Sequence, residues 1–249
     1  MEAIRTENLT KKYKTKTAVD HIGLTVHEGE LFALLGVNGA GKTTTIRMLT
    51  CLSAPTEGDA LVDGHSCVRE SAAVKAIVGI SPQDTSVAGK LTVYENLQFI
   101  ARVYGLDKQR SEDRIGEMMR VFGLDEVKSQ QAKTLSGGWM RKLSIAMALL
   151  PEPKVLFLDE PTLGLDVLAR RELWKAIRSL KGKITVVLTT HHMEEAESLA
   201  DRIAIMISGQ IRAVGTLPEL EQKTGQTGLE NVFVAIADAD GDAETREGE

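Results

Sequence analysis

The chain has 249 residues, of which 43% are hydrophobic, with 30 Lys and Arg against 35 Asp and Glu. This length allows a hydrophobic core that needs no disulfide bonds, and two cysteines are too few for a disulfide framework. The net charge of −5 argues against a nucleic-acid partner, and the sequence has no apolar stretch near the ~20 residues of a membrane-spanning helix, so we expect a globular, cytoplasmic protein.

Short apolar runs along the chain predict the strands of a sheet. The segment 22–26 alternates apolar and polar residues, which is typical of a half-buried strand. Several later runs are apolar on both faces, as in the middle of a parallel sheet that helices cover on both sides. We therefore predict an α/β fold. The predicted strands, in chain order, are 22–26, 31–35, 60–64, 155–158, 185–188 and 203–207.

Helical spacing fills the segments between these strands, because apolar residues recur about every three to four positions. Residues from about 88 to 134 contain such helices and no convincing strand, so we interpret them as a helical subdomain inserted into the α/β core. Near the C-terminus, an apolar run at 232–237 precedes an acidic segment, 238–249, which we expect to be a flexible tail. The predicted helical stripes are 97–104, 115–122, 143–150 and 173–180.

Residues 36–43 read Gly-Val-Asn-Gly-Ala-Gly-Lys-Thr and fit the phosphate-binding pattern G-x-x-x-x-G-K-[ST], between a predicted strand and a predicted helix. Glycines in this pattern let successive backbone N–H groups turn toward a phosphate at the positive end of a helix. Lys42 adds a positive charge near the β- and γ-phosphates, and the Thr43 hydroxyl can bind Mg²⁺. The predicted nucleotide contacts of this loop are Gly36, Asn38, Gly39, Ala40, Gly41, Lys42, Thr43 and Thr44.

Two carboxylates, Asp159 and Glu160, follow the apolar strand at 155–158. Because ligands of parallel sheets bind at the carboxyl ends of the strands, we expect Asp159 to face the phosphate-binding loop and to bind Mg²⁺. Glu160 is then the candidate base that orients a water molecule in line with the γ-phosphate. On its own, Asp-Glu-Pro also suits a solvated loop, and it is the phosphate-binding loop that favours the catalytic interpretation.

A second glycine pair precedes the helical segment at 143–150. Residues 135–138 read Leu-Ser-Gly-Gly, so Ser136 can cap the helix while the glycines leave the next N–H groups open to an anion. The alternative is an ordinary capped helix. The position of the pair shortly before Asp159 favours a second phosphate contact, through Ser136 and Gly138.

These motifs, in this order, resemble those of the ATP-binding cassette (ABC) ATPases over residues 1–220. Residues 36–43 resemble the Walker A loop of the family, the end of the strand at 155–158 its Walker B motif, and 135–138 the first four residues of its LSGGQ signature. The resemblance implies ATP and Mg²⁺ as ligands. It also implies a P-loop NTPase core with a mixed sheet, an N-terminal antiparallel β subdomain and an inserted helical subdomain, followed by a short C-terminal extension at 221–249.

Three further residues acquire roles through this resemblance. Gln83 resembles the Q-loop glutamine that contacts Mg²⁺ and relays to the membrane partner. His191 resembles the switch histidine of the γ-phosphate, and we choose it over His192 because it directly follows the strand and two threonines. Tyr13 occupies the place of an aromatic ring that stacks on adenine. The implied catalytic residues are Glu160, His191 and Lys42, and the implied metal ligands are Thr43, Gln83 and Asp159.

Two positions depart from the pattern of the family. Trp139 stands where the signature has Gln, and Leu163 stands where the D-loop commonly has Ser. The phosphate-binding and catalytic residues are unchanged, so we expect the site to work. Trp139 then packs either on the ribose side or against a neighbouring helix.

The resemblance also implies partners. One copy of each motif implies a second copy of the chain, whose signature completes the site, in an ATP-dependent homodimer. A separate transmembrane permease would hold the chain at the inner face of the cell membrane. The segments 43–49 and 190–197 look most like those of multidrug and antibiotic exporter ATPases. We therefore expect Mg²⁺-dependent ATP hydrolysis that powers export of drugs or other small hydrophobic compounds; the alternative is a non-transport ABC ATPase, such as an iron–sulfur assembly ATPase.

Overall fold

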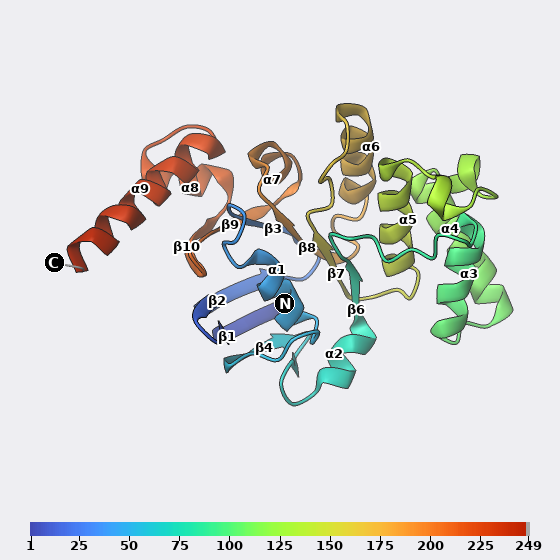
Figure 1. The fold of residues 1–249 in the computed structure, drawn as a ribbon, viewed down its shortest axis with the longest axis horizontal. Helices are drawn as coiled ribbons and strands as arrows, with labels where there is room; N and C mark the ends of the chain where they lie inside the picture. The colour runs from blue at the N-terminus through green and yellow to red at the C-terminus, as the bar shows by residue number, and fades with distance from the viewer. Residues whose placement is uncertain (248–249) are drawn as a thin grey trace.

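A six-stranded sheet forms the centre of the computed structural model, which describes the backbone of residues 1–247 and the side chains of residues 1–240 (Figure 1). Its strands are β3 (Leu31–Leu35), β6 (Val78–Ser81), β7 (Val155–Asp159), β8 (Thr185–Thr190), β9 (Arg202–Ile207) and β10 (Gln210–Gly215). Their order is β10-β9-β3-β8-β7-β6; β9 and β10 are antiparallel, and all other neighbours are parallel. This mixed sheet confirms the predicted fold class.

A second, antiparallel sheet is built from the N-terminal part of the chain. Its strands are β1 (Glu2–Tyr13), β2 (Lys16–His27), β4 (Glu57–Val62) and β5 (His65–Ser66). They are paired in the order β2-β1-β4-β5, as the predicted N-terminal antiparallel subdomain requires. Helix α1 (Lys42–Leu49) contacts both sheets, so it lies between them (Figure 1).

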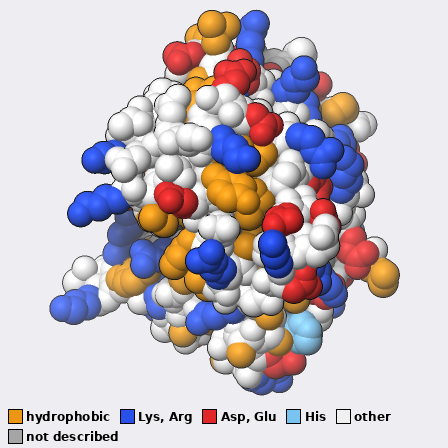
Figure 2. Space-filling model, turned by 90° about the vertical axis from the view of Figure 1, so that its right-hand side faces the viewer, with side chains coloured by type: hydrophobic (Ala, Val, Ile, Leu, Met, Phe, Trp, Pro, Cys, Tyr) orange, Lys and Arg blue, Asp and Glu red, His pale blue; other side chains and the backbone are white. Residues whose placement is uncertain are grey.

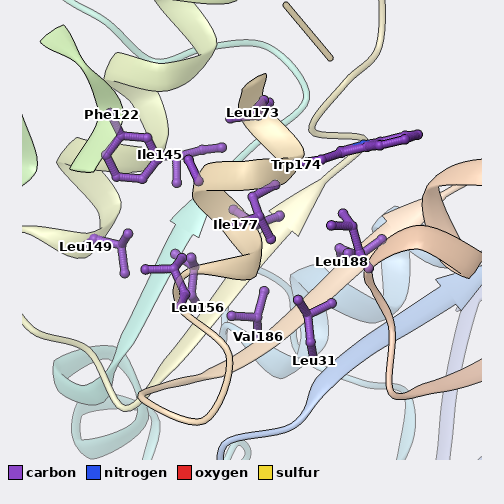
Figure 3. Packing of buried hydrophobic residues seen from close by; sticks show 14 of the residues in the cluster. Leu31, Phe122, Ile145, Leu149, Leu156, Leu173, Trp174, Ile177, Val186 and Leu188 are labelled. Carbon is purple, nitrogen blue, oxygen red and sulfur yellow. The ribbon is translucent and has the colours of Figure 1, made fainter. Parts of the chain in front are cut away.

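The central strands are buried on both faces because two hydrophobic clusters cover them. Phe32, Phe157 and Val187 pack on the face toward α1 and the antiparallel sheet. On the opposite face the sheet is covered by α5 (Gly137–Leu149) and α6 (Val167–Arg178) (Figure 3). A register shift of one residue would exchange the side chains of the two faces. Figure 3 labels the strand residues Leu31, Leu156, Val186 and Leu188 and the helix residues Ile145, Leu149, Leu173 and Ile177 at this second contact.

Helices occupy the segment that the sequence predicts as a helical subdomain. Thr92 and Glu95 form a capping box at the start of the first helix, and the Asp107 side chain caps the second. Gly123 ends the second helix with φ 64°, in the left-handed region that favours glycine. The limits of the subdomain stay a prediction. The elements here are α3 (Val93–Val103), α4 (Lys108–Phe122) and the 3₁₀ segments Leu124–Val127 and Ala132–Thr134; α2 (Ser71–Ile77) precedes them.

The C-terminal part of the described chain continues as helices, and the flexibility expected of residues 238–249 stays a prediction. After α7 (Met193–Leu199), the chain forms α8 (Leu217–Thr224) and α9 (Leu229–Glu247). The stripe of Leu229, Val232 and Phe233 is buried in the large cluster, which accounts for a helix in this segment. The boundary predicted at residue 220 falls inside α8 and stays a prediction, and residues 248–249 lie outside the described residues.

The face that carries the helical subdomain has a hydrophobic patch bordered by charged side chains (Figure 2). Helix α3 and its C-cap leave Phe99, Val103 and Tyr104 exposed, at 53%, 62% and 51% of their surface. Within residues 1–247, none of the helices combines the length and the apolar character that a membrane span requires.

Candidate functional site

The phosphate-binding loop, residues 36–43, connects β3 to α1 at the edge where the parallel strands end. Gly41 is the N-cap of α1 and has φ 110°, which side chains rarely adopt. A Cβ atom at Gly36 would lie 2.4 Å from the backbone oxygen of Met206, and one at Gly41 would lie 2.4 Å from that of Ala18. The loop therefore needs glycine at both positions to pack this closely on its neighbours.

The ammonium group of Lys42 lies inside the curve of this loop. It donates hydrogen bonds of 2.7 Å to the carbonyl oxygen of Gly36 and 3.1 Å to that of Val37. The same nitrogen lies 3.3 Å from Glu160 Oε1, and both side chains are only 6% exposed. A buried lysine and a buried carboxylate thus form an ion pair on the floor of the loop.

Glu160, directly after β7, joins this lysine to a histidine. Its Oε2 lies 2.8 Å from His191 Nδ1, at the end of β8. The backbone of Glu160 has φ 47°, an unusual value for a non-glycine residue that is often found at functional sites. The ring of His192 lies 4.0 Å from that of His191, and burial together with its neighbour lowers the pKa of His192. The structure thus brings His191, the residue chosen from the sequence, to the carboxylate.

Asp159 is held between two hydroxyl groups. Its Oδ1 accepts hydrogen bonds of 3.1 Å from Thr43 Oγ1 and 2.6 Å from Thr189 Oγ1. Thr189 Oγ1 also accepts a 3.1 Å hydrogen bond from the backbone N–H of Glu160. Thr189 was not predicted as a site residue; its signal is a pair of threonines, Thr189 and Thr190, at the end of a fully buried strand.

These groups open onto a cleft of about 430 Å³ at the carboxyl ends of β3, β7 and β8. Gly36, Ala40 and Asp159 are buried and do not line the cleft surface. Sequence analysis did not assign a site role to Lys16 or Ala18, both of β2, which also line it. The lining residues are Lys16, Ala18, Asn38, Gly39, Gly41, Lys42, Thr43, Thr44, Gln83, Glu160, Leu163 and His191.

Gln83 reaches the cleft from the loop after β6, and a buried arginine holds its backbone. The guanidinium of Arg141, on α5, donates to the carbonyl oxygens of Pro82 and Gln83, each at 2.6 Å. Arg141 is 4% exposed, and burial lowers its pKa. Sequence analysis missed this contact, which ties the loop of Gln83 to the helix that begins at the second glycine pair.

Besides Gly36, Ala40 and Asp159, three further predicted site residues do not line this cleft. Ser136 and Gly138 lie at the start of α5, where Ser136 is the N-cap but its side chain makes no capping hydrogen bond. Tyr13, at the end of β1, is 46% exposed. The ring of Trp139 packs against the hydrophobic core, and Lys142 Nζ lies 4.5 Å from its centroid.

The site combines a glycine-rich loop between a strand and a helix with acidic and histidine side chains at the ends of two neighbouring strands. This combination defines a P-loop nucleoside-triphosphatase domain. The sequence profile of the family described as ABC transporter matches residues 19–163. The chain belongs to the ABC transporter family, as its ATP-binding ATPase domain.

Two curated relatives show the range of this family. The daunorubicin resistance ATP-binding protein DrrA3 of Streptomyces coeruleorubidus is 41% identical over 224 residues, which cover 90% of this chain and 71% of that protein. The human phospholipid-transporting ATPase ABCA3 is 41% identical over 226 residues, covering 89% of this chain. The chain spans only 13% of the length of that relative.

Among solved structures, the chain is similar to the ATP-binding cassette MJ0796, described as a dimer in a post-hydrolysis state bound to ADP and Pi. The two share 25% sequence identity with a TM-score of 0.78, over 86% of this chain and 98% of the other. Both sheets and the helical subdomain therefore follow the architecture of a nucleotide-binding cassette.

Proposed function

We propose that this chain is the Mg²⁺-dependent, ATP-hydrolysing subunit of an ABC exporter, and that it powers a separate permease for drugs or other small hydrophobic compounds. The observation that carries the proposal is the contact chain Lys42–Glu160–His191 on the floor of the cleft, with distances of 3.3 and 2.8 Å. The substrate class is supported by the name of the relative DrrA3, a drug-resistance ATP-binding protein of which this sequence covers 71%.

The residues of the cleft divide the reaction among them. The loop N–H groups and Lys42 bind the β- and γ-phosphates, so ATP replaces Glu160 as the partner of the ammonium group. Glu160 then takes a proton from water while the water oxygen bonds to the γ-phosphorus and the bond to ADP breaks. His191 lies at Oε2 of this carboxylate and orients it. The loop with Lys42 follows β3, Glu160 follows β7 and His191 follows β8, so these groups lie at one edge of the sheet.

The oxygen atoms beside the loop fit Mg²⁺. The Thr43 hydroxyl and an Asp159 carboxylate oxygen are 3.1 Å apart, and Gln83 lines the same cleft. Hydroxyl, carboxylate and amide oxygens are ligands that this hard cation prefers, so these three residues would hold it. When bound, Mg²⁺ supplies positive charge beside the β- and γ-phosphate oxygens. Thr189 keeps the Asp159 carboxylate oriented through its 2.6 Å hydrogen bond.

A second copy of the chain supplies the remaining phosphate contacts. Ser136 and Gly138 begin α5 outside the cleft of their own chain, where the N–H groups of the helix start can bind the γ-phosphate of another copy. The dimer described for the MJ0796 cassette supports this arrangement. Sedimentation of Glu160→Gln with ATP is expected to give a dimer, and Lys42→Ala a monomer. A monomer in both variants would contradict the proposal for the isolated chain.

The permease contacts the hydrophobic patch of the helical subdomain and so holds the chain at the inner face of the membrane (Figure 2). A groove of about 180 Å³ beside α3 is lined by apolar residues that include Ile80, Tyr104 and Met147. The exposed Phe99 and Val103 extend this surface. Phe99→Glu is expected to abolish co-purification with the permease while ATP binding is kept. Co-purification at the wild-type level would exclude this surface.

The function as a whole is tested by turnover and by transport. The chain with its permease is expected to release phosphate from ATP only when Mg²⁺ is present, and Lys42→Ala is expected to be inactive. Cells that express both proteins are expected to accumulate less of a fluorescent hydrophobic drug than cells with the Lys42→Ala variant. Equal accumulation would exclude drug export, and co-purification with a soluble iron–sulfur scaffold in place of a permease would favour the assembly ATPase.

A further inference from the structure

A buried carboxyl group, Glu195, lies behind the proposed catalytic residues and has no part in the reaction so far described. Glu195 is 0% exposed, and its Oε1 accepts a 3.1 Å hydrogen bond from Trp174 Nε1 of α6. Figure 3 shows Trp174 at the border of the hydrophobic cluster of α6. The backbone N–H of Glu195 donates to the carbonyl oxygen of His192 at 3.2 Å, so the residue lies directly beneath the turn of His191.

This carboxyl group has no ion-pair partner among residues 1–240. The cation that acts on it is Arg141, whose guanidinium already serves two backbone carbonyls, and the nearby anion is Glu160. Burial is the main cause that raises the pKa of Glu195, and the charge of Glu160 acts in the same direction. An isolated buried carboxylate is unfavourable, so the neutral acid is the form that suits this place.

Two polar atoms lack hydrogen-bond partners here: one oxygen of this carboxyl group and one neighbouring hydroxyl. Glu195 Oε2 and Thr162 Oγ1 are both buried, and neither makes a well-formed hydrogen bond. The hydroxyls of Thr162 and Thr190 nevertheless lie close enough to the carboxyl to lower its pKa, against the effect of burial. Buried polar atoms rarely stay unpaired, and a proton on Oε2 would let the acid donate to the Thr162 hydroxyl. The two residues can thus pair through these atoms, with the acid as the donor when Oε2 carries the proton.

We propose that Glu195 is a positioning residue of this ATPase site: as an un-ionised carboxylic acid, it joins the loop that follows Glu160 to the turn that carries His191. Thr162 lies two residues after Glu160. Thr190, whose hydroxyl acts on the Glu195 carboxyl and accepts a hydrogen bond from the backbone N–H of His192, directly precedes His191. The acid therefore fixes the distance between the base and the histidine from behind. The inference rests on the proposed roles of Glu160 and His191.

Variants of the full chain, measured with its permease, separate this role from a merely structural one. Glu195→Gln keeps a neutral group with an acceptor and a donor, so we expect kcat within about twofold of wild type, whereas Glu195→Ala lowers kcat about tenfold with KM within about twofold. Thr162→Val, which keeps the shape and removes the hydroxyl, is expected to lower kcat in the same way. The matched control is Glu194→Gln, on the neighbouring and exposed carboxylate, which is expected to change neither constant.

Infrared spectroscopy tests the protonation state directly. At pH 7 we expect a carbonyl stretching band of a protonated carboxylic acid that is present in wild type and missing in Glu195→Gln. A Gln variant as impaired as the Ala variant, or the absence of this band at neutral pH, would overturn the proposal. If wild type does not hydrolyse ATP, the proposed function fails, yet the infrared band still reports on Glu195.

Discussion

Replacing Glu160 by glutamine is expected to strengthen ATP binding and to slow ATP hydrolysis. The amide keeps the shape of the side chain and can still accept a hydrogen bond from His191. It removes the negative charge that lies 3.3 Å from Lys42 Nζ in the free protein. Hydrolysis therefore loses its base, while the phosphates of ATP no longer compete with a carboxylate for the ammonium group.

The magnitude follows from the geometry of the pair. Two unit charges at 3.3 Å attract each other by about 5 kcal/mol at an effective dielectric constant of about 20. Lys42 keeps its hydrogen bonds to two loop carbonyls in either state, so only part of this energy opposes binding. We expect a net gain of about 1–2 kcal/mol, which corresponds to ATP binding about 5- to 30-fold tighter. Loss of the base is expected to lower kcat about 10²- to 10⁴-fold.

Calorimetric titration with ATP gives the affinity, and phosphate release under saturating ATP gives kcat. Glu117→Gln is the matched control: this carboxylate pairs with Arg114 on α4, it is 48% exposed, and its loss is expected to change neither quantity. A Glu160→Gln variant that keeps more than about a tenth of kcat would show that another group is the base. Unchanged or weaker ATP binding would show that the ion pair of Glu160 with Lys42 does not oppose ATP binding.

Three further variants test the loop, a helix start and a buried acid. Gly36→Ala is expected to weaken ATP binding at least about tenfold with the fold retained, because the new Cβ would lie 2.4 Å from a backbone oxygen; unchanged affinity would contradict that close approach. Asp166→Ala removes a cap that accepts two backbone N–H bonds of 2.9 and 3.0 Å at the start of α6, so urea unfolding should show a loss of about 1 kcal/mol, and an equal midpoint would refute it. Glu195→Gln is expected to be more stable than wild type at pH 7. Burial raises the pKa of the folded acid above the ordinary glutamate value of 4.5, so wild type releases a proton on unfolding above that pH and alone loses stability as pH rises. The stability gap should vanish below about pH 4, and a constant gap across pH would show that the acid is ionised in the fold.

Three of the strands predicted from the sequence owe their signal to burial on both faces. Residues 31–35, 155–158 and 186–188 are continuous apolar runs because both of their faces are covered. Strand β1 was missed, since irregularities in its pairing with β2 break the two-residue alternation and half of its side chains face solvent. Strand β6 is short and contains Gly79, which packs against a backbone oxygen of α5 and weakens the strand signal.

In the site, the residues that could be predicted are those that lie close together in the sequence. The phosphate-binding loop is contiguous, so its spacing and its flanking elements could be recognised together. Arg141 contacts the Gln83 carbonyl across 58 residues of sequence, and Trp174 contacts Glu195 across 21. Such contacts depend on how helices pack on the sheet, and no local pattern records them. Arg141 lies outside the predicted stripe 143–150, so the sequence gives no local sign that this charged residue is buried.

The end of β8 explains why the site behaves as a unit. In a strand, successive side chains point to opposite faces, so Thr189 reaches Asp159 while Thr190 faces the turn of α7 and the Glu195 carboxyl. The next residue, His191, contacts Glu160. Three consecutive residues thus hold Asp159, the proposed metal ligand, the buried acid Glu195, and Glu160, the proposed base. A shift of this strand end would move Thr189, Thr190 and His191 together. The distances among Glu160, Asp159 and His191 are therefore set by the sheet rather than by the loops.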